Sequence, residues 1–178
     1  LTGEQYMSDE ELITLATELE GHPDNVAAAF YGGATIAWLE SKDGKDGSKN
    51  SIGRAVSLKV DDRIKALLLI PENQLSTAKA RKLLPETIPH QDAVLNSSRS
   101  ALLVHALAER PDLLFTATED ALHQRYREQA MPKTIVLMEK LRGAGLAAVV
   151  SGAGPSVMVL YSGAEDEIDQ LQSVAQGF

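Results

Sequence analysis

The first part of the chain places apolar residues at helical intervals and then changes to a strand-like pattern. One face of the expected first helix consists of residues three and four apart: Leu12, Ile13, Leu15, Ala16 and Leu19. Ser8 and Glu11 have the spacing of a capping box, so this helix should begin just after Ser8. Gly21 and Pro23 should end it.

A second helix is expected from near Asp24 to Gly32, and residues 34–40 follow it with the β-branched and aromatic composition of a strand. Residues 41–51 are rich in charged residues, glycine and serine, which predicts a solvated hairpin loop and not a site. Residues 55–60 should form the returning strand.

Strands and helices alternate in the rest of the chain. The continuous apolar run at 64–71 predicts a strand buried on both faces, with a buried helix segment as the less favoured alternative. Helical patterns then cover four segments: 76–84, 91–109, 113–127 and 133–142. The fourth should end on Gly143 in a C-cap arrangement.

The chain closes with a strand at 147–151, a tight turn at 152–155, a strand at 156–161 and an acidic amphipathic helix from about Ala164. Strands that alternate with helices and close with a hairpin-like pair indicate an α+β sandwich.

Composition narrows the function classes. The 178 residues include 17 Lys and Arg against 25 Asp and Glu, a net charge of −8 that argues against nucleic-acid binding. With 44% apolar and 24% charged residues the chain should bury a sizeable core. No apolar run reaches the roughly 18 residues of a membrane span, and the first residues lack the layout of a signal peptide, so no membrane association is expected.

The chain contains no cysteine, which excludes disulfides, thiol nucleophiles and thiolate zinc sites. This composition fits a reducing compartment, and we expect a cytoplasmic protein. Because the chain starts with a helix-like pattern and not with Met, we also expect it to be part of a longer one.

The segment Glu20–Asn25 concentrates polar side chains at a forced turn between two expected helices. It could be a linker in which Asp24 or Asn25 caps the next helix and His22 is simply exposed. It could also be a site that includes a carboxylate-held Mg²⁺, since that ion needs only one or two carboxylates plus phosphate oxygens. Zinc is excluded, because the four histidines share no short spacing.

Two further features could carry chemistry. The glycine-rich turn at 151–156 allows positive φ angles and close approach of an anion, although many such turns are only tight hairpins. Thr77 and Arg81 lie four residues apart on one expected helix face, and Arg127 is near the end of another helix. Arginine suits carboxylate or phosphate groups, although a surface salt bridge is the commoner role for any single arginine.

Four segments, taken together, resemble the homoserine kinases of the GHMP small-molecule kinase family. They are EGHPDNVAAAFYGG (20–33), STAKARKLLP (76–85), DALHQRYREQAMP (120–132) and GAGLAAVVSGAGPSVMVL (143–160). The first is specific to this branch, and the last is similar to the third motif of the family, with Ala153 where serine is common. The family's glycine- and serine-rich phosphate loop is not among these residues and should lie upstream.

The resemblance implies transfer of a phosphoryl group from ATP, with Mg²⁺, to the side-chain hydroxyl of L-homoserine on the route to threonine. It implies that His22, Asp24 and Asn25 lie near the amino acid, with Asp24 and Asn25 in the catalytic role. Whether Asp24 removes a proton or only orients the hydroxyl is open. Glu20 is the candidate for Mg²⁺, with Glu18 as the runner-up.

The resemblance also assigns residues to the substrate's charged groups. It places Thr77, Arg81 and Arg127 at the carboxylate or phosphate, and it gives Gly152 and Gly154 the turn beside the substrate. No nucleotide-binding residue can be named without the phosphate loop. Phosphoryl transfer needs alignment and charge neutralisation more than covalent chemistry, which agrees with these roles.

For the fold, the resemblance implies that residues 1–61 are the second half of a nucleotide and substrate domain that resembles ribosomal protein S5. Residues 62–178 would be the ferredoxin-like carboxyl-terminal domain. Another GHMP kinase specificity is the nearest alternative function, and a non-catalytic binding or dimerisation module derived from such a kinase is another. A homodimer is left open. The 178 residues alone are expected to be inactive.

Overall fold

The computed structural model describes residues 7–43, 49–72, 75–76, 80–163 and 165–175. Contacts divide the chain into two compact units, Leu1–Val60 and Asp61–Phe178. Within the described residues, no helix is both long enough and apolar enough to cross a membrane.

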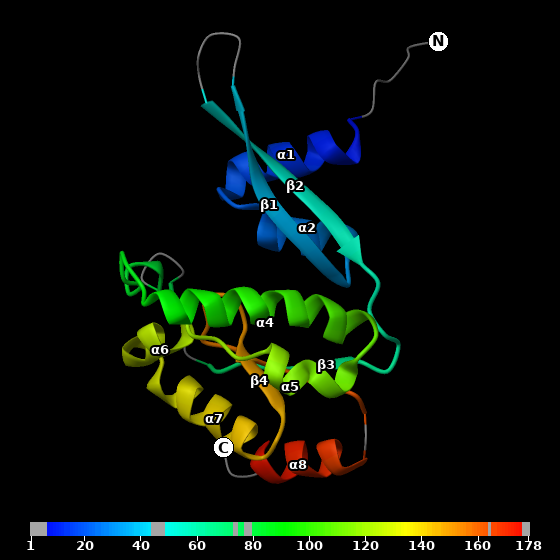
Figure 1. Ribbon diagram of the computed structural model, residues 1–178, viewed down its shortest axis with the longest axis vertical. Helices are drawn as coiled ribbons and strands as arrows, with labels where there is room; N and C mark the ends of the chain where they lie inside the picture. The colour runs from blue at the N-terminus through cyan, green and yellow to red at the C-terminus, as the bar shows by residue number, and fades with distance from the viewer. Residues whose placement is uncertain (1–6, 44–48, 73–74, 77–79, 164, 176–178) are drawn as a thin grey trace. The chain divides into compact units, whose positions relative to one another are not determined.

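In the first unit, the described residues form two helices and a β-hairpin (Figure 1). Helix α1 (Asp9–Glu20) begins at the predicted capping box, since the side chains and backbone N–H groups of Ser8 and Glu11 are hydrogen bonded in both directions. Gly21 ends it in the left-handed conformation, with φ of 87°. Helix α2 (Pro23–Tyr31) follows directly and ends at Gly32.

Strands β1 (Ala34–Asp43) and β2 (Lys49–Leu58) pair antiparallel from Ala34 opposite Leu58 to Asp43 opposite Lys49. The loop predicted at 41–51 is therefore too long, because the ladder continues through charged residues at both of its ends. Helices α1 and α2 pack on the hairpin and on each other. Gly53 faces α1 so closely that a Cβ atom there would lie 2.2 Å from Oγ1 of Thr17.

The second unit contains a three-stranded antiparallel sheet in the order β3-β5-β4. Its strands are β3 (Lys65–Leu69), β4 (Ala147–Val150) and β5 (Val157–Tyr161). The helices are α4 (His90–Ala108), η1 (Pro111–Leu113), α5 (Leu114–Ala117), α6 (Gln124–Arg127), η2 (Glu128–Ala130), α7 (Pro132–Gly143) and α8 (Glu165–Ala175). This mixed arrangement confirms the predicted α+β class.

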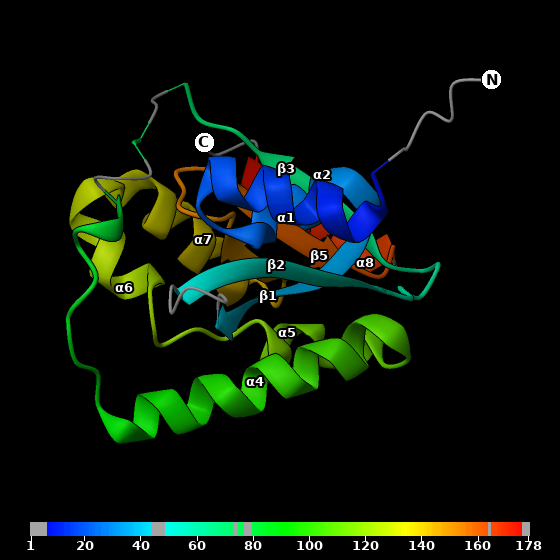
Figure 2. The ribbon, with the colours of Figure 1, turned by 90° about the horizontal axis from the view of Figure 1, so that it is seen from above.

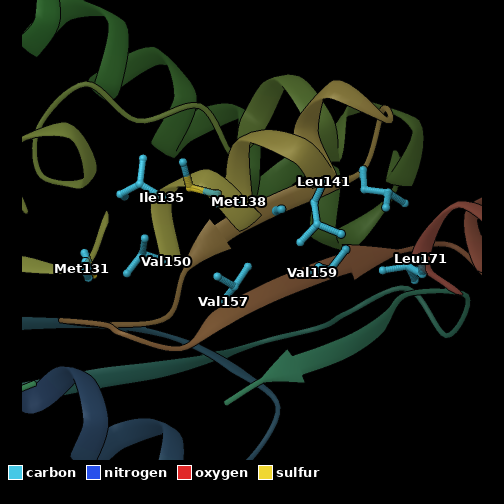
Figure 3. Packing of buried hydrophobic residues seen from close by; sticks show 10 residues of the cluster. Met131, Ile135, Met138, Leu141, Val150, Val157, Val159 and Leu171 are labelled. Atoms are coloured by element: carbon cyan, nitrogen blue, oxygen red, sulfur yellow. The ribbon is translucent and has the colours of Figure 1, made fainter. Parts of the chain in front are cut away.

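Alternate residues of the strands bury against helices on opposite faces of this sheet. On one face, Ile135 and Leu141 of α7 pack with Val157 and Val159 of β5, and Leu171 of α8 completes the cluster (Figure 3). On the other face, Ala147 of β4 packs with three buried residues of helices α4 and α5: Ala106 of α4, and Leu114 and Ala117 of α5. Helix α4 runs beside α5 (Figure 2).

Strand β3 corrects the prediction of a strand buried on both faces. It pairs only with β5 among the described residues, and Leu68 and Ile70 are 47% and 73% exposed. Its continuous apolar composition indicated burial, but burial depends on the place of a strand in the sheet, and β3 lies at the edge.

The helix predicted over 113–127 is also wrong. The chain forms η1 and α5, leaves helical conformation at Thr118, and enters α6 only at Gln124. The carboxylate of Asp120 accepts the backbone N–H groups of Leu122, His123 and Gln124 at 3.1, 3.0 and 2.8 Å. These side-chain bonds replace the helical bonds of the same N–H groups, so a new helical turn begins here.

Two helix ends differ from the predictions as well. Helix α7 ends at Gly143, but the glycine in the left-handed conformation is Gly145, with φ of 86°. In the segment expected to form a helix at 76–84, the N–H of Ala80 donates to the carbonyl of Ser76 at 3.0 Å, and a turn begins at Lys82. Residues 77–79 lie outside the described residues.

Candidate functional site

The candidate residues of the first unit lie at the junction of α1 and α2. His22 is the N-cap residue of α2 with an extended backbone, and buried Pro23 takes the first helical position. Neither Asp24 nor Asn25 caps the helix, so the linker interpretation is wrong on this point. Asp24 and Asn25 instead occupy the second and third helical positions, where backbone N–H groups are not used by the helix itself.

Asp24 joins the three polar residues of this junction. Its Oδ1 atom accepts the backbone N–H of Asn25 at 2.7 Å and lies 3.3 Å from Nδ1 of His22. That nitrogen is shielded from solvent and has no hydrogen-bond partner among the described residues. The Asp24 side chain remains 58% exposed. The structure therefore brings His22, Asp24 and Asn25 together, with a carboxylate accessible at a helix N-terminus.

The candidate metal ligands Glu18 and Glu20 are both exposed in the last turn of α1. They are two residues apart, so their side chains leave different sides of the helix and would not share one ion. Within the described part of the chain, no three His, Asp or Glu side chains form a group that could hold a metal. A Mg²⁺ ion here would need most of its ligands from phosphate oxygens or water, which is the usual arrangement for this ion.

Three candidate residues of the second unit, Arg127, Gly152 and Gly154, lie at or against the turn between β4 and β5. The N–H of Ser151 donates to the carbonyl of Ser156 at 2.8 Å, which closes this turn. Gly152 and Gly154 have φ angles of 58° and 82°, a region that other residues rarely adopt. A Cβ atom at Gly154 would lie 2.5 Å from Sδ of Met131, whereas one at Gly152 would meet nothing within 4 Å. Gly152 therefore borders open space.

Arg127 of α6 lies against this turn and is only 8% exposed. Its Nη1 donates to the carbonyl of Gly152 at 3.1 Å and lies 3.2 Å from Nδ1 of His123. Its Nε is buried and has no hydrogen-bond partner in the described chain. An unpaired donor on a buried cation is costly, so this edge of the guanidinium is suited to an anionic ligand.

Arg81 lies within electrostatic range of Arg127. Burial lowers the pKa of Arg127, the carboxylate of Asp120 raises it, and the charge of Arg81 lowers it further. The structure thus brings Arg127 and Gly152 into contact, and the charge of Arg81 is close enough to disfavour a second positive charge at Arg127. Thr77 lies outside the described residues.

Sequence reasoning missed the side chains that support this cluster. Asp120 accepts three backbone N–H groups, and Asn96 of α4 donates to Asp120 at 3.4 Å. Gln124 accepts the buried N–H of Val150 at 2.7 Å. The available signal was the four-residue spacing of His123 and Arg127, the same spacing that indicated Thr77 and Arg81.

Comparisons with known proteins agree with the motifs. Residues 98–176 match the family described as GHMP kinases C terminal. The chain is 47% identical to a homoserine kinase of Streptomyces coelicolor over 97% of this chain and 52% of that protein. It is 52% identical to a homoserine kinase of Leifsonia xyli over 91% of this chain and 47% of that protein. The chain therefore spans about half the length of these curated relatives.

Solved structures show the same fold. The crystal structure of homoserine kinase from Cytophaga hutchinsonii aligns with 98% of this chain and 55% of its own, with a TM-score of 0.75 at 24% identity. A putative homoserine kinase of Listeria monocytogenes aligns with 96% of this chain and 53% of its own, with a TM-score of 0.56 at 27% identity. The resemblance to homoserine kinases is confirmed, and residues 98–176 match the carboxyl-terminal family of the GHMP kinases.

Proposed function

We propose that the full-length protein carrying this chain transfers the γ-phosphoryl group of ATP to the hydroxyl of L-homoserine, giving O-phospho-L-homoserine for threonine synthesis. The observation that carries this proposal is that the similarity to homoserine kinases extends over nearly the whole chain. Identity of 47% extends over 97% of the chain, well beyond the carboxyl-terminal domain match at 98–176, and so includes the Glu20–Gly33 segment. The cysteine-free composition fits a reaction in the cytoplasm.

We assign the two units different tasks in this reaction. Residues 1–61 contribute the second half of the nucleotide and substrate domain, and residues 62–178 form the carboxyl-terminal domain. In the second unit, Arg127 and Arg81 hold the carboxylate or phosphate of the substrate. The buried Nε of Arg127, without a partner in the described chain, supports this role. Gly152 and Gly154 shape the turn beside the bound amino acid, and Thr77 belongs to the same group.

In the first unit, the accessible carboxylate of Asp24 orients the hydroxyl of homoserine for in-line attack, with His22 and Asn25 beside it. The hydrogen bond from Asn25 and the nearby imidazole keep this carboxylate in one place. Glu20 is the proposed ligand for Mg²⁺, with Glu18 as the alternative. The ion, when bound with ATP, neutralises the charge of the phosphates, which is most of what such a site supplies.

The isolated chain tests where the nucleotide binds. A chain with a net charge of −8 and no phosphate loop among its residues should repel a triphosphate. The purified 178-residue chain should melt cooperatively but release no ADP in response to homoserine. The full-length protein should do so. Turnover by the isolated chain would show that the nucleotide site lies within these residues and would contradict our assignment.

Substrate range distinguishes the alternatives. The full-length protein should use L-homoserine in preference to other small alcohols offered with ATP and Mg²⁺. Preference for a different alcohol would indicate another GHMP kinase specificity, and no turnover with any of them would favour a binding or dimerisation module. Arg81→Ala should weaken homoserine use by about 1.5 to 3 kcal/mol, the cost of a charged hydrogen bond, while the KM for ATP stays nearly constant.

A further inference from the structure

The neighbours of His123 determine which of its two ring nitrogens carries a proton. Nδ1 of His123 lies 3.2 Å from Nη1 of Arg127. Because a guanidinium group only donates hydrogen bonds, Nδ1 must accept and cannot carry a proton. The ring proton is then on Nε2, which lies 3.5 Å from Oδ1 of Asp120. His123 is therefore a neutral imidazole oriented between a carboxylate and a guanidinium.

Asp120 is itself held in place. Its carboxylate is only 8% exposed and accepts three backbone N–H groups of the segment that leads into α6. Asn96 donates to Asp120 at 3.4 Å and accepts the N–H of Ala121 at 2.7 Å. A chain of contacts thus runs from the long helix α4 through Asp120 and His123 to Arg127.

This chain of contacts decides which edge of the guanidinium remains for a ligand. Nη1 of Arg127 is held by His123 and by the carbonyl of Gly152. Nε has no partner in the described chain, and covalent geometry places Nη2 on the same edge as Nε. That edge is the two-donor fork that binds a carboxylate.

We propose that neutral His123 is a positioning residue, which holds Nη1 of Arg127 against the glycine turn so that the Nε–Nη2 edge receives the carboxylate of the amino-acid substrate. The identity of that substrate rests on the function proposed above. The orientation of Arg127 by His123 does not, because it follows from contacts within the second unit.

Protonation of His123 would remove this support. An imidazolium could no longer accept from Arg127 and would place a second positive charge 3.2 Å from Nη1. Burial lowers the pKa of His123, Asp120 raises it, and Arg127 lowers it. Arg81 adds further positive charge near Arg127. The net direction keeps His123 neutral at physiological pH.

Two ion pairs lie on the elements next to this cluster. Asp92 of α4 forms an ion pair with Arg125 of α6, and Arg99 of α4 forms one with Glu119 at 2.7 Å. Burial and Arg127 lower the pKa of His123, so this histidine should take up a proton only at a pH below its ordinary range.

The test compares His123→Ala, His123→Asn and the control His105→Asn in the full-length protein. Asparagine can place its amide oxygen near the position of Nδ1 and does not titrate. His105 is a half-exposed histidine of α4 outside the cluster. For each variant, kcat and the KM values for L-homoserine and ATP are measured from about pH 5.5 to 8.

His123→Ala should raise the KM for L-homoserine about tenfold, with kcat and the KM for ATP within about twofold of the unsubstituted protein. His123→Asn should restore most of the affinity and abolish the rise in KM at acidic pH. His105→Asn should behave like the unsubstituted protein. An unchanged homoserine KM in His123→Ala, or equal losses in kcat and both KM values together with a lower melting temperature, would overturn the positioning role.

A spectroscopic readout keeps the inference separate from the proposed function. In ¹⁵N-histidine spectra of the full-length protein, the signal that disappears in His123→Asn should report an unprotonated Nδ1 and a pKa below the ordinary histidine value. A proton on Nδ1 would overturn the proposal whether or not the protein phosphorylates homoserine. Absence of any homoserine turnover together with the expected spectrum would reject the function and leave the orientation of Arg127 in place.

Discussion

A buried hydrogen bond joins Gln124 to Val150: Oε1 of the glutamine accepts the backbone N–H of the valine at 2.7 Å. Gln124 is the first residue of α6, and Val150 is the last residue of β4, just before the glycine turn. The bond therefore ties together the two segments that bring Arg127 to the carbonyl of Gly152. A neutral side chain outside the proposed ligand contacts thus determines how closely those two segments approach.

Replacement of this side chain should cost stability. Gln124→Leu keeps a similar volume but leaves the buried N–H of Val150 without a partner, which costs about 1 to 3 kcal/mol. Urea unfolding of the full-length protein measures the effect. The control is Gln129→Leu, an exposed site in η2, where the change should stay within about 0.5 kcal/mol. Equal midpoints for the two variants would show that the bond contributes nothing.

Two glycines provide a matched test of packing. Gly53→Ala would place a Cβ atom 2.2 Å from Oγ1 of Thr17, which itself donates to the carbonyl of Ile13 at 2.6 Å. We expect a loss of about 1 to 3 kcal/mol in the free energy of unfolding. Gly143→Ala meets nothing within 4 Å in the last turn of α7 and should be neutral or stabilising by up to about 1 kcal/mol. In thermal unfolding, the melting temperature of Gly53→Ala should fall, and that of Gly143→Ala should stay the same or rise.

The parts of the fold that were predictable from sequence are those determined over short distances. The capping box of Ser8 and Glu11 involves partners within one helical turn, so their spacing was sufficient. The break at Asp120 was missed because its carboxylate replaces helical bonds with side-chain bonds, a choice that apolar periodicity does not report. The exposure of β3 depends on the order of the strands in the sheet, and the sequence of a single segment does not report that order.

The candidate site shows the same division. The motifs identified Arg127 and Gly152 separately, but only the packing of α6 against the turn shows that they are hydrogen bonded. His123 and Asp120 act through Arg127, so a search for ligand-binding residue types passes over them. The role of Gln124 depends on its hydrogen bond to Val150, in a strand more than twenty residues further along the chain. No local sequence pattern indicates that partner.

Asp24 should be needed for turnover and not for stability. Asp24→Asn keeps the hydrogen bond from Asn25 and removes the charge, so kcat should fall about a hundredfold or more. The melting temperature should change little, since an acidic residue in the first helical turn contributes only about 0.3 to 1 kcal/mol. Steady-state kinetics and thermal unfolding of the full-length protein give both quantities.

The control for Asp24 is Asp9→Asn, which removes an acidic residue from the first turn of α1. It should lower stability to a similar degree and leave turnover normal. Asp24→Ala adds the loss of the hydrogen bond and should reduce kcat at least as strongly. Normal turnover in both Asp24 variants would show that Asp24 has no part in catalysis and contributes only to the end of the helix.

The environment of Asp120 should make the stability of the protein depend on pH. Burial alone would raise the pKa of Asp120, but the backbone N–H groups of Gln124 and His123, and the charge that His123 carries once acid has protonated it, lower that pKa below its ordinary value of 3.8. The unfolded chain then binds the proton more readily, so the stabilisation is complete above the unfolded pKa and is lost as the pH falls through the folded pKa. Acidification should therefore destabilise the protein in part through this residue.

Asp120→Asn measures that contribution. It should cost about 1 to 3 kcal/mol near pH 7 by losing charge-assisted hydrogen bonds. The deficit should shrink as the pH falls below about 4, because the unfolded chain binds the proton first and the native carboxylate follows at lower pH. Urea unfolding at several pH values gives the comparison. A deficit independent of pH would mean that the charge of Asp120 does not contribute.

The close approach of Gly53 to Thr17 also has a consequence for how the hairpin assembles. A strand can slide along its partner, and a slip of one residue turns every side chain to the opposite face. Slips of one or two positions would bring Ser51, Ile52, Arg54 or Ala55 to the place of Gly53, and each carries a Cβ atom that the space beside Thr17 cannot hold. Gly53 thus determines the register of the two strands, because α1 can pack on the hairpin only when Gly53 pairs with Leu39.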